Sequence, residues 1–369
     1  MRSPSSVCYA PFISMNFDQT GTITACCFNR KQLLGTYPNN SVAQVWNGNA
    51  LKELRNALMQ NDLTKGCQQC GKMIVEGNFE SVLIRHFDDH ADLSGALKKA
   101  PRSTGILNRL LDRKRPDLTP VMLEFELSNH CNLECIMCGG KWSSAIRKNR
   151  EGLPPLKSPY DKAFVEQIRE FLPNLSRANF LGGEPFLIGI YYDIWEAIIE
   201  ANPNIEVAIT SNGTMLNQRA KLVIEQLNQC KVTLSIDSLQ KETWESIRRN
   251  GKFENLRANI DWLLNAGKLR SFSVCPMIQN WKEMPEIMAF CVQHNLDIYF
   301  NIVYGQLGGK PEGGHRTDLV PEVSLKTLSR LELNEVITYY NKQSFPARQQ
   351  TQLNSLITQL TSWRDQKPE

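Results

Sequence analysis

Between residues 121 and 303, six strand-like segments alternate with amphipathic helical segments, and this alternation constrains the fold more than any other feature. The strands are expected at 121–127, 177–181, 205–210, 231–236, 271–277 and 297–303, and the helices near 159–172, 188–201, 217–228, 240–249, 254–267 and 282–294. Strands joined by helices form parallel sheets. Six units are too few for a closed eight-fold barrel, so we predict a partial (β/α)6 barrel with its chemistry at the carboxyl ends of the strands.

The rest of the chain divides into three parts. Residues 1–75 form a small cysteine-bearing module, residues 76–120 a mostly helical connector, and residues 304–369 a Gly-rich loop with a helical tail. The predicted fold class is therefore α/β, a partial barrel (121–303) preceded by a small cysteine-rich domain. With 41% hydrophobic and 22% charged residues, the composition excludes disordered, collagen-like and coiled-coil chains.

Charge and hydropathy argue against nucleic acid and membrane as partners. The net charge is only +4, and no segment approaches the ~18 uninterrupted apolar residues of a membrane span. The amino terminus has no convincing signal-peptide cleavage site, so we expect a cytoplasmic protein. Its 11 cysteines would then stay reduced, and cysteine clusters in such a compartment are typical of metal or iron–sulfur ligands rather than disulfides.

The first cysteine cluster is Cys131-Asn-Leu-Glu-Cys135-Ile-Met-Cys138, directly after the first barrel strand. This spacing curls a loop so that three thiolates converge, whereas a closed zinc or iron–sulfur site requires four ligands. Three cysteines leave one metal position open to an exogenous ligand. The alternative is a zinc site with His130 as its fourth ligand.

A Cys-x3-Cys-x2-Cys loop after the first strand of a partial barrel resembles the radical S-adenosylmethionine (SAM) superfamily. The resemblance implies that Cys131, Cys135 and Cys138 hold a [4Fe–4S] cluster whose fourth iron binds SAM. Reduction then cleaves SAM to a 5′-deoxyadenosyl radical, which abstracts a substrate hydrogen atom. A reductant such as flavodoxin or ferredoxin is implied as well.

Segments that resemble the family's SAM-binding motifs end the next strands in order. GGEP (Gly182, Gly183, Glu184 and Pro185) is expected to receive the SAM amino group, and Ser211 and Asn212 of the TNG-like segment are expected to line the site. An ordinary turn would explain the two glycines alone, but it explains GGEP at this location poorly. Ser235 and Asp237 of the Ser-Ile-Asp segment are expected to reach the ribose, Arg248 to pair with the SAM carboxylate, and Asn280 to occupy another recurring position of the SAM site.

The amino-terminal module holds a second cysteine group, whose spacing around a Trp-Asn and a Leu-x2-Leu-Arg segment resembles the auxiliary-cluster modules called SPASM or Twitch. The resemblance implies one auxiliary [4Fe–4S] cluster with Cys8, Cys26, Cys67 and Cys70 as ligands, and Cys27 as the substitute for Cys26. The alternative is a structural zinc site, which would stabilise the module without carrying electrons.

Three cysteines remain. Cys275, on the fifth strand, and Cys230, just before the fourth, could face the barrel lumen and return a hydrogen atom to a substrate radical, as peptide epimerases of the superfamily do; Cys291 is expected in the core. We interpret Tyr191, Tyr192 and Trp195 as core, and His86, His90 and the basic stretch 98–116 as surface. Tyr304 and His315 flank a Gly-rich loop that would either be flexible or act as a lid over the substrate.

The resemblance implies a radical SAM enzyme that splices, epimerises or crosslinks a ribosomally made precursor peptide (a RiPP maturase). Residues 1–70 are used by the cysteine module, so a partner protein would present the precursor. One alternative is a dehydrogenase or epimerase of a sugar or aminocyclitol. Another is an iron–sulfur or zinc scaffold that does not cleave SAM, against which the complete set of SAM-site motifs argues.

Overall fold

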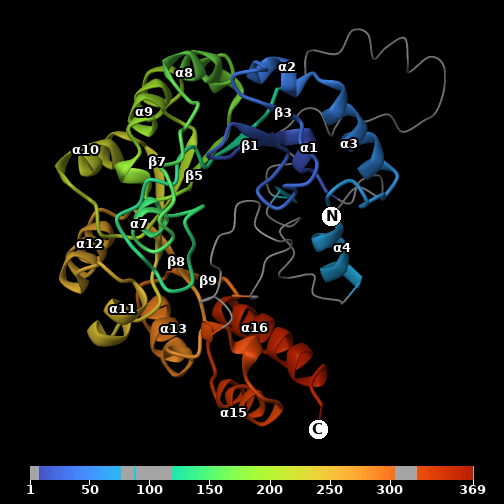
Figure 1. The fold of residues 1–369 in the computed structure, drawn as a ribbon. Coiled ribbons are helices and arrows are strands. Elements are labelled where there is room, and N and C mark those ends of the chain that lie inside the picture. Colours follow the sequence, from blue (N-terminus) through green and yellow to red (C-terminus); the bar gives the residue numbers. More distant parts are fainter. Residues whose placement is uncertain (1–7, 76–86, 89–118, 304–321, 369) are drawn as a thin grey trace.

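The computed structural model describes residues 8–75, 87–88, 119–303 and 322–368. In these ranges a nine-stranded sheet has the order β3-β2-β1-β4-β5-β6-β7-β8-β9, with helices along its outer side (Figure 1). No helix within them is long and apolar enough to cross a bilayer. Outside the described residues lie the basic stretch 98–116, His86, His90, and the loop with Tyr304 and His315.

The strands are β1 (Ser14–Phe17), β2 (Thr22–Thr24), β3 (Gly35–Thr36), β4 (Met122–Phe125), β5 (Arg177–Phe180), β6 (Glu206–Ser211), β7 (Gln229–Ser235), β8 (Leu269–Val274) and β9 (Asp297–Phe300). The helices are α1 (Ala10–Ile13), α2 (Val42–Trp46), α3 (Asn49–Met59), α4 (Gln68–Val75), α7 (Ser144–Asn149), α8 (Lys162–Arg169), α9 (Gly189–Ala201), α10 (Gln218–Gln226), α11 (Lys241–Ile247), α12 (Phe253–Asn265), α13 (Met284–Gln293), α15 (Arg330–Asn341) and α16 (Ala347–Asp365). Short 3-10 helices occupy Leu172–Asn174, Pro185–Leu187, Trp281–Glu283 and Leu325–Thr327.

Strands β4 to β9 are parallel neighbours in chain order, with at least one helix between each consecutive pair. This confirms the predicted partial (β/α)6 barrel. Each expected strand overlaps an observed one, and the helices of the barrel begin and end within a few residues of the predicted positions. The carboxyl ends of all six strands meet at one rim of the sheet, where the connecting loops gather.

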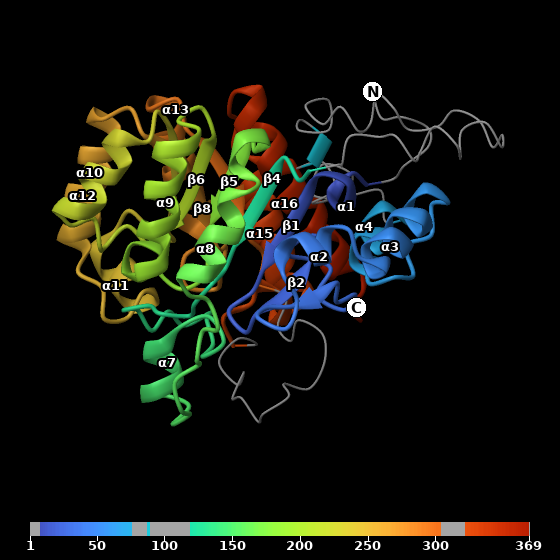
Figure 2. The same cartoon turned by 90° about the horizontal axis from the view of Figure 1, so that it is seen from above.

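The amino-terminal module belongs to the same sheet. Its strand β1 pairs in parallel with β4 over four residue pairs, and β2 and β3 continue the sheet in antiparallel order. The turn between β1 and β2 is stabilised because Asp18 Oδ1 accepts hydrogen bonds from the backbone N–H groups of Thr20 and Thr22, while Gly21 adopts a φ of +90°. Figure 2 shows the module helices and the barrel helices α9–α13 toward opposite ends of the sheet.

The two faces of the sheet differ in polarity, because alternate residues of a strand point to opposite sides. On the outer face, the rings of Phe17, Phe125 and Phe180 stack across β1, β4 and β5 with centroids 5.6 and 5.0 Å apart. Phe164 of α8 packs on them. Tyr191, Tyr192 and Trp195 of α9 are buried in the same core, as predicted.

The inner face carries polar side chains in rows. One row contains Asn16, Glu124 and Asn179, which are register partners on β1, β4 and β5. The other contains Thr210, Thr233 and Ser271, which are register partners on β6, β7 and β8. The hydroxyl oxygens of Thr233 and Ser271 are 2.7 Å apart.

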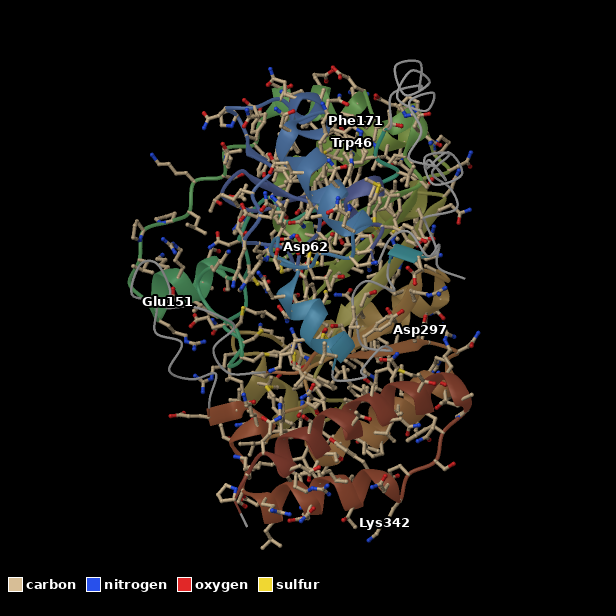
Figure 3. The ribbon with its side chains drawn as sticks, turned by 90° about the vertical axis from the view of Figure 1, so that its right-hand side faces the viewer. Trp46, Asp62, Glu151, Phe171, Asp297 and Lys342 are labelled. Atoms are coloured by element: carbon tan, nitrogen blue, oxygen red, sulfur yellow. The ribbon has the colours of Figure 1, made fainter. Side chains whose placement is uncertain are left out.

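Helices α15 and α16 cover the end of the sheet beside β9. Asp297, labelled in Figure 3, pairs with Arg270 of β8 and with Arg348 of α16. The phenol of Tyr340 in α15 donates a hydrogen bond to the carbonyl of Trp281 (2.9 Å). These contacts place the predicted helical tail against the last strands of the barrel.

Candidate functional site

Three cysteines meet at the carboxyl-end rim of the sheet. Cys131, Cys135 and Cys138 lie in the loop that follows β4, which we call the three-cysteine loop (residues 128–143). Burial, together with the charges of Glu184 and Cys135, raises the pKa of Cys131 to about 12. Burial also raises the pKa of Cys138, and Cys135 and Cys131 add to that rise. The structure therefore brings the three predicted ligands together.

A buried thiolate is stable only beside positive charge. Burial raises the pKa of Cys135, and Arg248 opposes the rise because its Nη1 lies 3.8 Å from Cys135 Sγ. Three clustered soft donors are the ligand type that iron–sulfur clusters use. This donor set fits a cluster that keeps one iron open.

A short helix braces the three-cysteine loop. Ser143 is the N-cap of α7 and accepts a hydrogen bond from the backbone of Ile146. Ser144 Oγ accepts a hydrogen bond from Cys131 N (3.1 Å) and donates one to Cys131 O (3.2 Å). Arg150 donates to the carbonyl of Cys135 (3.2 Å). Our sequence reasoning missed α7, although a serine N-cap before a helix-forming segment was a readable signal.

The glycines of the GGEP segment pack on the backbone of the three-cysteine loop. Gly183 N donates to Ser128 O (2.9 Å) and Glu184 N to His130 O (2.7 Å). A Cβ on Gly183 would stand 2.2 Å from His130 O, and one on Gly182, whose φ is +107°, would stand 2.7 Å from Ser128 O. These two glycines therefore allow the GGEP segment and the three-cysteine loop to approach each other closely.

The carboxylate of Glu184 connects the ends of β5 and β6. It accepts hydrogen bonds from Ser211 Oγ and Asn212 N, both at 2.8 Å, and from Phe186 N at 3.2 Å. Burial raises its pKa to about 7 against the effect of these bonds, and Pro185 follows it as the first residue of a 3-10 helix. Both oxygens of Glu184 are therefore engaged within the chain.

The predicted residues of the TNG-like segment lie beside the first cysteine. Asn212 Nδ2 donates to Asn132 Oδ1 (3.0 Å) and lies 3.9 Å from Cys131 Sγ. Ser211 is buried at the end of β6. Asn132, which sequence reasoning did not single out, thus links the three-cysteine loop to the third barrel strand.

A buried ion pair stands at the ends of β7 and α11. Arg248 Nη2 lies 2.8 Å from Asp237 Oδ2, and Asp237 Oδ1 accepts a hydrogen bond from Cys275 N (2.8 Å). Burial opposes the charge on Arg248, but Asp237, Cys135 and Cys275 outweigh it and raise the pKa of the guanidinium. Arg248 Nε is buried and has no hydrogen-bond partner among the residues described, so it can donate to a ligand.

Two other predicted SAM-site residues flank this pair. Asn280 is buried, donates to the carbonyls of Asp237 (2.7 Å) and Cys275 (3.1 Å), and accepts from Met277 N (2.7 Å). Ser235 is partly buried at the end of β7. The oxygens of Asp237, which we expected at the ribose, are directed to Arg248 and Cys275 instead.

The remaining cysteines lie in three different places. Strand β8 ends at Val274, so Cys275 begins the following loop rather than lying on the strand. Burial raises its pKa, and Asp237, Cys135 and Cys138 contribute to the rise, so its thiol lies near the three-cysteine loop. The position expected for Cys230 was wrong: it is the second residue of β7, buried at the end away from the rim, because this strand begins two residues earlier than predicted. Cys291 is buried in α13.

His130, the alternative fourth ligand, is exposed. Its Nδ1 lies 3.1 Å from the carbonyl oxygen of Leu187. Ligands of one zinc ion lie within ~4.6 Å of each other, twice the ~2.3 Å Zn–S distance. In the described ranges no group of three His, Cys, Asp or Glu side chains is arranged around a single ion, whereas a [4Fe–4S] cluster spreads its cysteines over separate irons.

The amino-terminal module contains a second cysteine site. Four cysteines line one cavity, the auxiliary cavity, and Asn29 reaches two of them: its backbone N lies 3.4 Å from Cys26 Sγ and its Nδ2 lies 3.3 Å from Cys67 Sγ. Burial raises the pKa of Cys8, and three neighbouring thiols contribute to the rise. The lining residues are Cys8, Cys26, Phe28, Asn29, Leu63, Gly66, Cys67, Gln69, Cys70 and Phe87.

Cys27 is not among these lining residues. Burial raises the pKa of its thiol, and the next largest cause is the charge of Glu124 on the inner face of β4, ahead of Cys26 and Glu126. The structure thus brings together the four cysteines predicted as auxiliary ligands around one cavity, and their predicted substitute, Cys27, is not among the residues that line it.

Contacts that sequence reasoning missed join the two cysteine sites. Arg30 Nη2 lies 2.8 and 2.9 Å from the two carboxylate oxygens of Glu126, and its guanidinium lies 5.0 Å from the ring centre of Trp142. Gln19 Nε2 donates to Lys141 O (3.0 Å). The segment that follows Cys26 and Cys27 therefore contacts the three-cysteine loop. No local signal could have identified these pairs, because their members are 96 to 122 residues apart.

Comparison with known families agrees with this geometry. The family model of the radical SAM superfamily matches residues 125–291. The model of the iron–sulfur cluster-binding domain called SPASM matches residues 8–71. The first of these ranges contains the three-cysteine loop and the strand ends around it, and the second contains Cys27 and the four cysteines that line the auxiliary cavity.

Among curated relatives, the GTP 3′,8-cyclase of Saccharophagus degradans is 24% identical over 194 residues, 52% of this chain and 56% of that protein. The probable GTP 3′,8-cyclase of Methanocella arvoryzae is 30% identical over 148 residues, 39% of this chain and 44% of that protein. The chain spans about half the length of the curated relatives it matches.

Two solved structures are also similar. Streptococcus suis SuiB bound to S-adenosylmethionine is 16% identical with a TM-score of 0.45 and covers 81% of this chain and 60% of its own. The protein anSMEcpe, with bound AdoMet and the Kp18Cys peptide, is 16% identical with a TM-score of 0.43 and covers 60% of this chain and 59% of its own.

Proposed function

Since this chain carries a radical SAM domain preceded by an iron–sulfur cluster-binding SPASM domain, we propose that it is an enzyme that modifies a ribosomally made precursor peptide. The observation that carries the proposal is the three-cysteine loop and the four-cysteine cavity built on one sheet. Proteins resembling this combination most often modify peptides. Excision of a backbone fragment, epimerisation and crosslinking are the reactions within the proposal.

The proposed assignment of the three-cysteine loop follows its donor set. Cys131, Cys135 and Cys138 would hold a [4Fe–4S] cluster, which with SAM supplies one-electron cleavage and a 5′-deoxyadenosyl radical. Arg248 places positive charge beside Cys135 and is our candidate partner of the SAM carboxylate through its unpaired Nε. Ser235 is our candidate for a ribose contact.

The other motif residues would act mainly by positioning. Glu184, Asp237 and Asn280 are buried, and their polar atoms bind other strand ends. They fix the relative positions of four neighbouring strand ends around the cysteines. The glycines Gly182 and Gly183 hold the GGEP segment against the three-cysteine loop, so its backbone would offer the SAM amino group a rigid surface.

The auxiliary cavity would hold a second [4Fe–4S] cluster through Cys8, Cys26, Cys67 and Cys70. The two contacts from Asn29 to Cys26 and Cys67 are of the kind that tunes such clusters. We propose a cytoplasmic enzyme that receives electrons from flavodoxin or ferredoxin and its precursor peptide from a presenting protein. In the hydroxyl row of Thr210, Thr233 and Ser271, Ser271 is buried and lies 2.7 Å from the Thr233 hydroxyl, so the partly exposed Thr210 and Thr233 would offer hydrogen bonds to a peptide backbone.

A nucleotide substrate is the second candidate. The observation in its favour is the similarity of 52% and 39% of this chain to two proteins named GTP 3′,8-cyclase and probable GTP 3′,8-cyclase. A sugar or aminocyclitol substrate stays a further alternative, because hydroxyl side chains on the inner face also suit a polyol.

The proposal is tested by anaerobic reconstitution with iron and sulfide, followed by dithionite and SAM. We expect 5′-deoxyadenosine by mass spectrometry, and we expect the triple variant of Cys131, Cys135 and Cys138 to Ala to form none while retaining the iron of the amino-terminal module. Co-expression with precursor peptides encoded beside the gene should give a mass change that the triple variant does not produce. Consumption of GTP without a peptide mass change would favour the nucleotide candidate, and 5′-deoxyadenosine from the triple variant would contradict the assignment of the loop.

A further inference from the structure

Cys27 follows Cys26, which lines the auxiliary cavity, and its backbone N–H lies near the carboxyl of Glu124. The charge of Glu124 is the largest influence on the Cys27 thiol after burial. Cys27 does not line the cavity, and Asn29 reaches Cys26 and Cys67 but not Cys27. Cys27 is therefore the one cysteine of the amino-terminal module that does not line the cavity.

Glu124 has a buried oxygen without a partner. The residue is 4% exposed, and its Oε1 accepts a hydrogen bond from Asn179 Nδ2 (3.2 Å). Its Oε2 is buried and has no hydrogen-bond partner among the residues that the structure describes. Burial raises the pKa of the carboxyl to about 7, while Asn179 and the backbone N–H of Cys27 lower it. Burying an oxygen without a hydrogen bond costs free energy because its hydration is lost, so such an atom in a folded protein requires an explanation.

The polar side chains nearest to Glu124 in the sheet have other partners than its Oε2. Asn16, its register partner on β1, lies within hydrogen-bond distance of Glu126 and Thr24 instead. Glu126, two residues along β4, is paired with Arg30. The carboxylate of Glu124 is thus the one member of this polar row that keeps an acceptor free.

The free oxygen points to the concave side of the sheet. Phe125, the next residue on β4, packs outward on Phe164 of α8, so Glu124 points to the inner face. The same face carries the hydroxyl row of Thr210, Thr233 and Ser271. Strand β4 leads from Glu124 directly into the three-cysteine loop. A molecule held at Glu124 therefore lies on the inner face, between the two cysteine sites in the sheet.

We propose that Glu124, with Cys27 beside it, forms a substrate subsite that binds a hydrogen-bond donor, an amide N–H or an ammonium group. A carboxylate accepts hydrogen bonds and donates none. An N–H group therefore supplies the hydrogen bond that Oε2 lacks, whereas an apolar group would leave Oε2 buried without one. An anion is repelled by the carboxylate of Glu124, whereas the charge of Glu126 is compensated by Arg30. The subsite deepens the proposed function, on which it rests, because a peptide offers an N–H at nearly every residue.

The first test uses the cluster-loaded protein and requires no peptide. Cys27 alkylation by iodoacetamide is followed by peptide mapping in the presence of methylammonium or, at equal concentration, tetramethylammonium. The two cations share their charge, but only methylammonium has N–H donors. We expect methylammonium to slow alkylation of Cys27 several-fold more than tetramethylammonium does, and this difference to vanish in Glu124→Gln. The Gln side chain keeps the size of Glu and can present an NH2 donor in place of the free oxygen.

Equal rates with the two cations would overturn the subsite. So would a Cys27 that reacts only after iron is removed, because it would then be a cluster ligand. A Cys27 that stays unreactive in both forms would also overturn it, since the subsite must admit a ligand. Two controls report whether Glu124→Gln is folded. Its iron content, and the amount of 5′-deoxyadenosine that it forms without peptide, should both equal the wild-type values.

The second test measures the modified peptide. Glu124→Gln should raise the KM for the peptide ten- to a hundredfold and change kcat less, as expected for the loss of a charge-assisted hydrogen bond. An unchanged KM would overturn the subsite. If methylammonium protects Cys27 selectively but the wild type modifies no peptide, the subsite remains supported and the proposed peptide function is contradicted. The failure of the subsite and the failure of the proposed function are therefore distinguishable.

Discussion

The buried pair of Arg248 and Asp237 allows a stability prediction that separates folding from ligand binding. In Arg248→Met the carboxylate of Asp237 stays buried and loses the only partner of its Oδ2 among the described residues. Removing one partner of a buried pair costs about 3–5 kcal/mol. Asp237 Oδ1 still accepts a hydrogen bond from Cys275 N, so we expect a loss near the lower end, about 3 kcal/mol.

A double variant provides the control. Arg248→Met with Asp237→Asn removes both charges, so most of the lost stability should return, because an amide is far less costly to bury than an unpaired carboxylate. Formation of 5′-deoxyadenosine should not return, since Met cannot bind the SAM carboxylate. Stability is measured by urea unfolding of the iron-free proteins under anaerobic conditions, with tryptophan fluorescence as the signal.

The pH dependence has a definite sign. Burial already raises the pKa of Asp237, and Arg248 opposes that rise, so Arg248→Met raises the pKa further. A folded state with a raised carboxyl pKa binds more protons than the unfolded state, and the variant therefore loses stability as pH rises above the unfolded pKa of about 3.9. A loss below about 0.5 kcal/mol at neutral pH, the range of an ordinary surface substitution, would refute the buried pair. A double variant no more stable than the single one would refute it as well.

Three further predictions test other parts of the molecule. Cys26→Ala should lower the iron content of the reconstituted protein by about four atoms, one [4Fe–4S] cluster, whereas Cys27→Ala should leave it unchanged; equal iron in the two variants would remove the distinction between these cysteines. Tyr37→Phe removes the hydrogen bond from the phenol to Asp161 (2.6 Å), which lowers the pKa of that carboxyl. The variant should lose about 1 kcal/mol of unfolding free energy at neutral pH, a value reduced for the exposure of Asp161. A lowered folded pKa stabilises above the unfolded pKa, so the difference from wild type should shrink as pH falls below about 4, and a difference independent of pH would contradict the bond. Cys275→Ala should lower the yield of modified peptide while 5′-deoxyadenosine still forms, if Cys275 donates hydrogen; an unchanged yield measured by mass spectrometry would return Cys275 to a structural role.

Local pattern was enough to predict the barrel. Each strand segment is a short apolar run followed by an amphipathic helix, and such units leave few topologies to choose from. The three-cysteine loop and the GGEP segment could be located because both directly follow strands. The pairing of β1 with β4 could not be predicted, because periodicity identifies a strand but not its neighbour, and more than 100 residues separate the two.

The sequence also could not predict what individual side-chain atoms bind. A Ser-Ile-Asp segment places Asp237 at a strand end, but the partners of its oxygens come from α11 and from the loop after β8. Glu184 is similar, since its oxygens bind the end of the next strand. Whether a polar atom is available to a ligand depends on contacts between elements distant in the chain, and only the folded structure contains them.

The shared sheet determines how the two cysteine sites are related. Strand β1 lies beside β4 with four residue pairs in register, and Phe17 and Phe125 stack on the outer face. On the inner side, Arg30 binds Glu126 on the strand that leads into the three-cysteine loop. A separation fixed by strand register and packed rings cannot change without breaking the sheet, whereas one set by a linker can. Electron transfer or substrate movement between the two cysteine sites therefore requires no hinge between the module and the barrel. A substrate held at the proposed Glu124 subsite would lie on the inner face of the sheet, which both sites share.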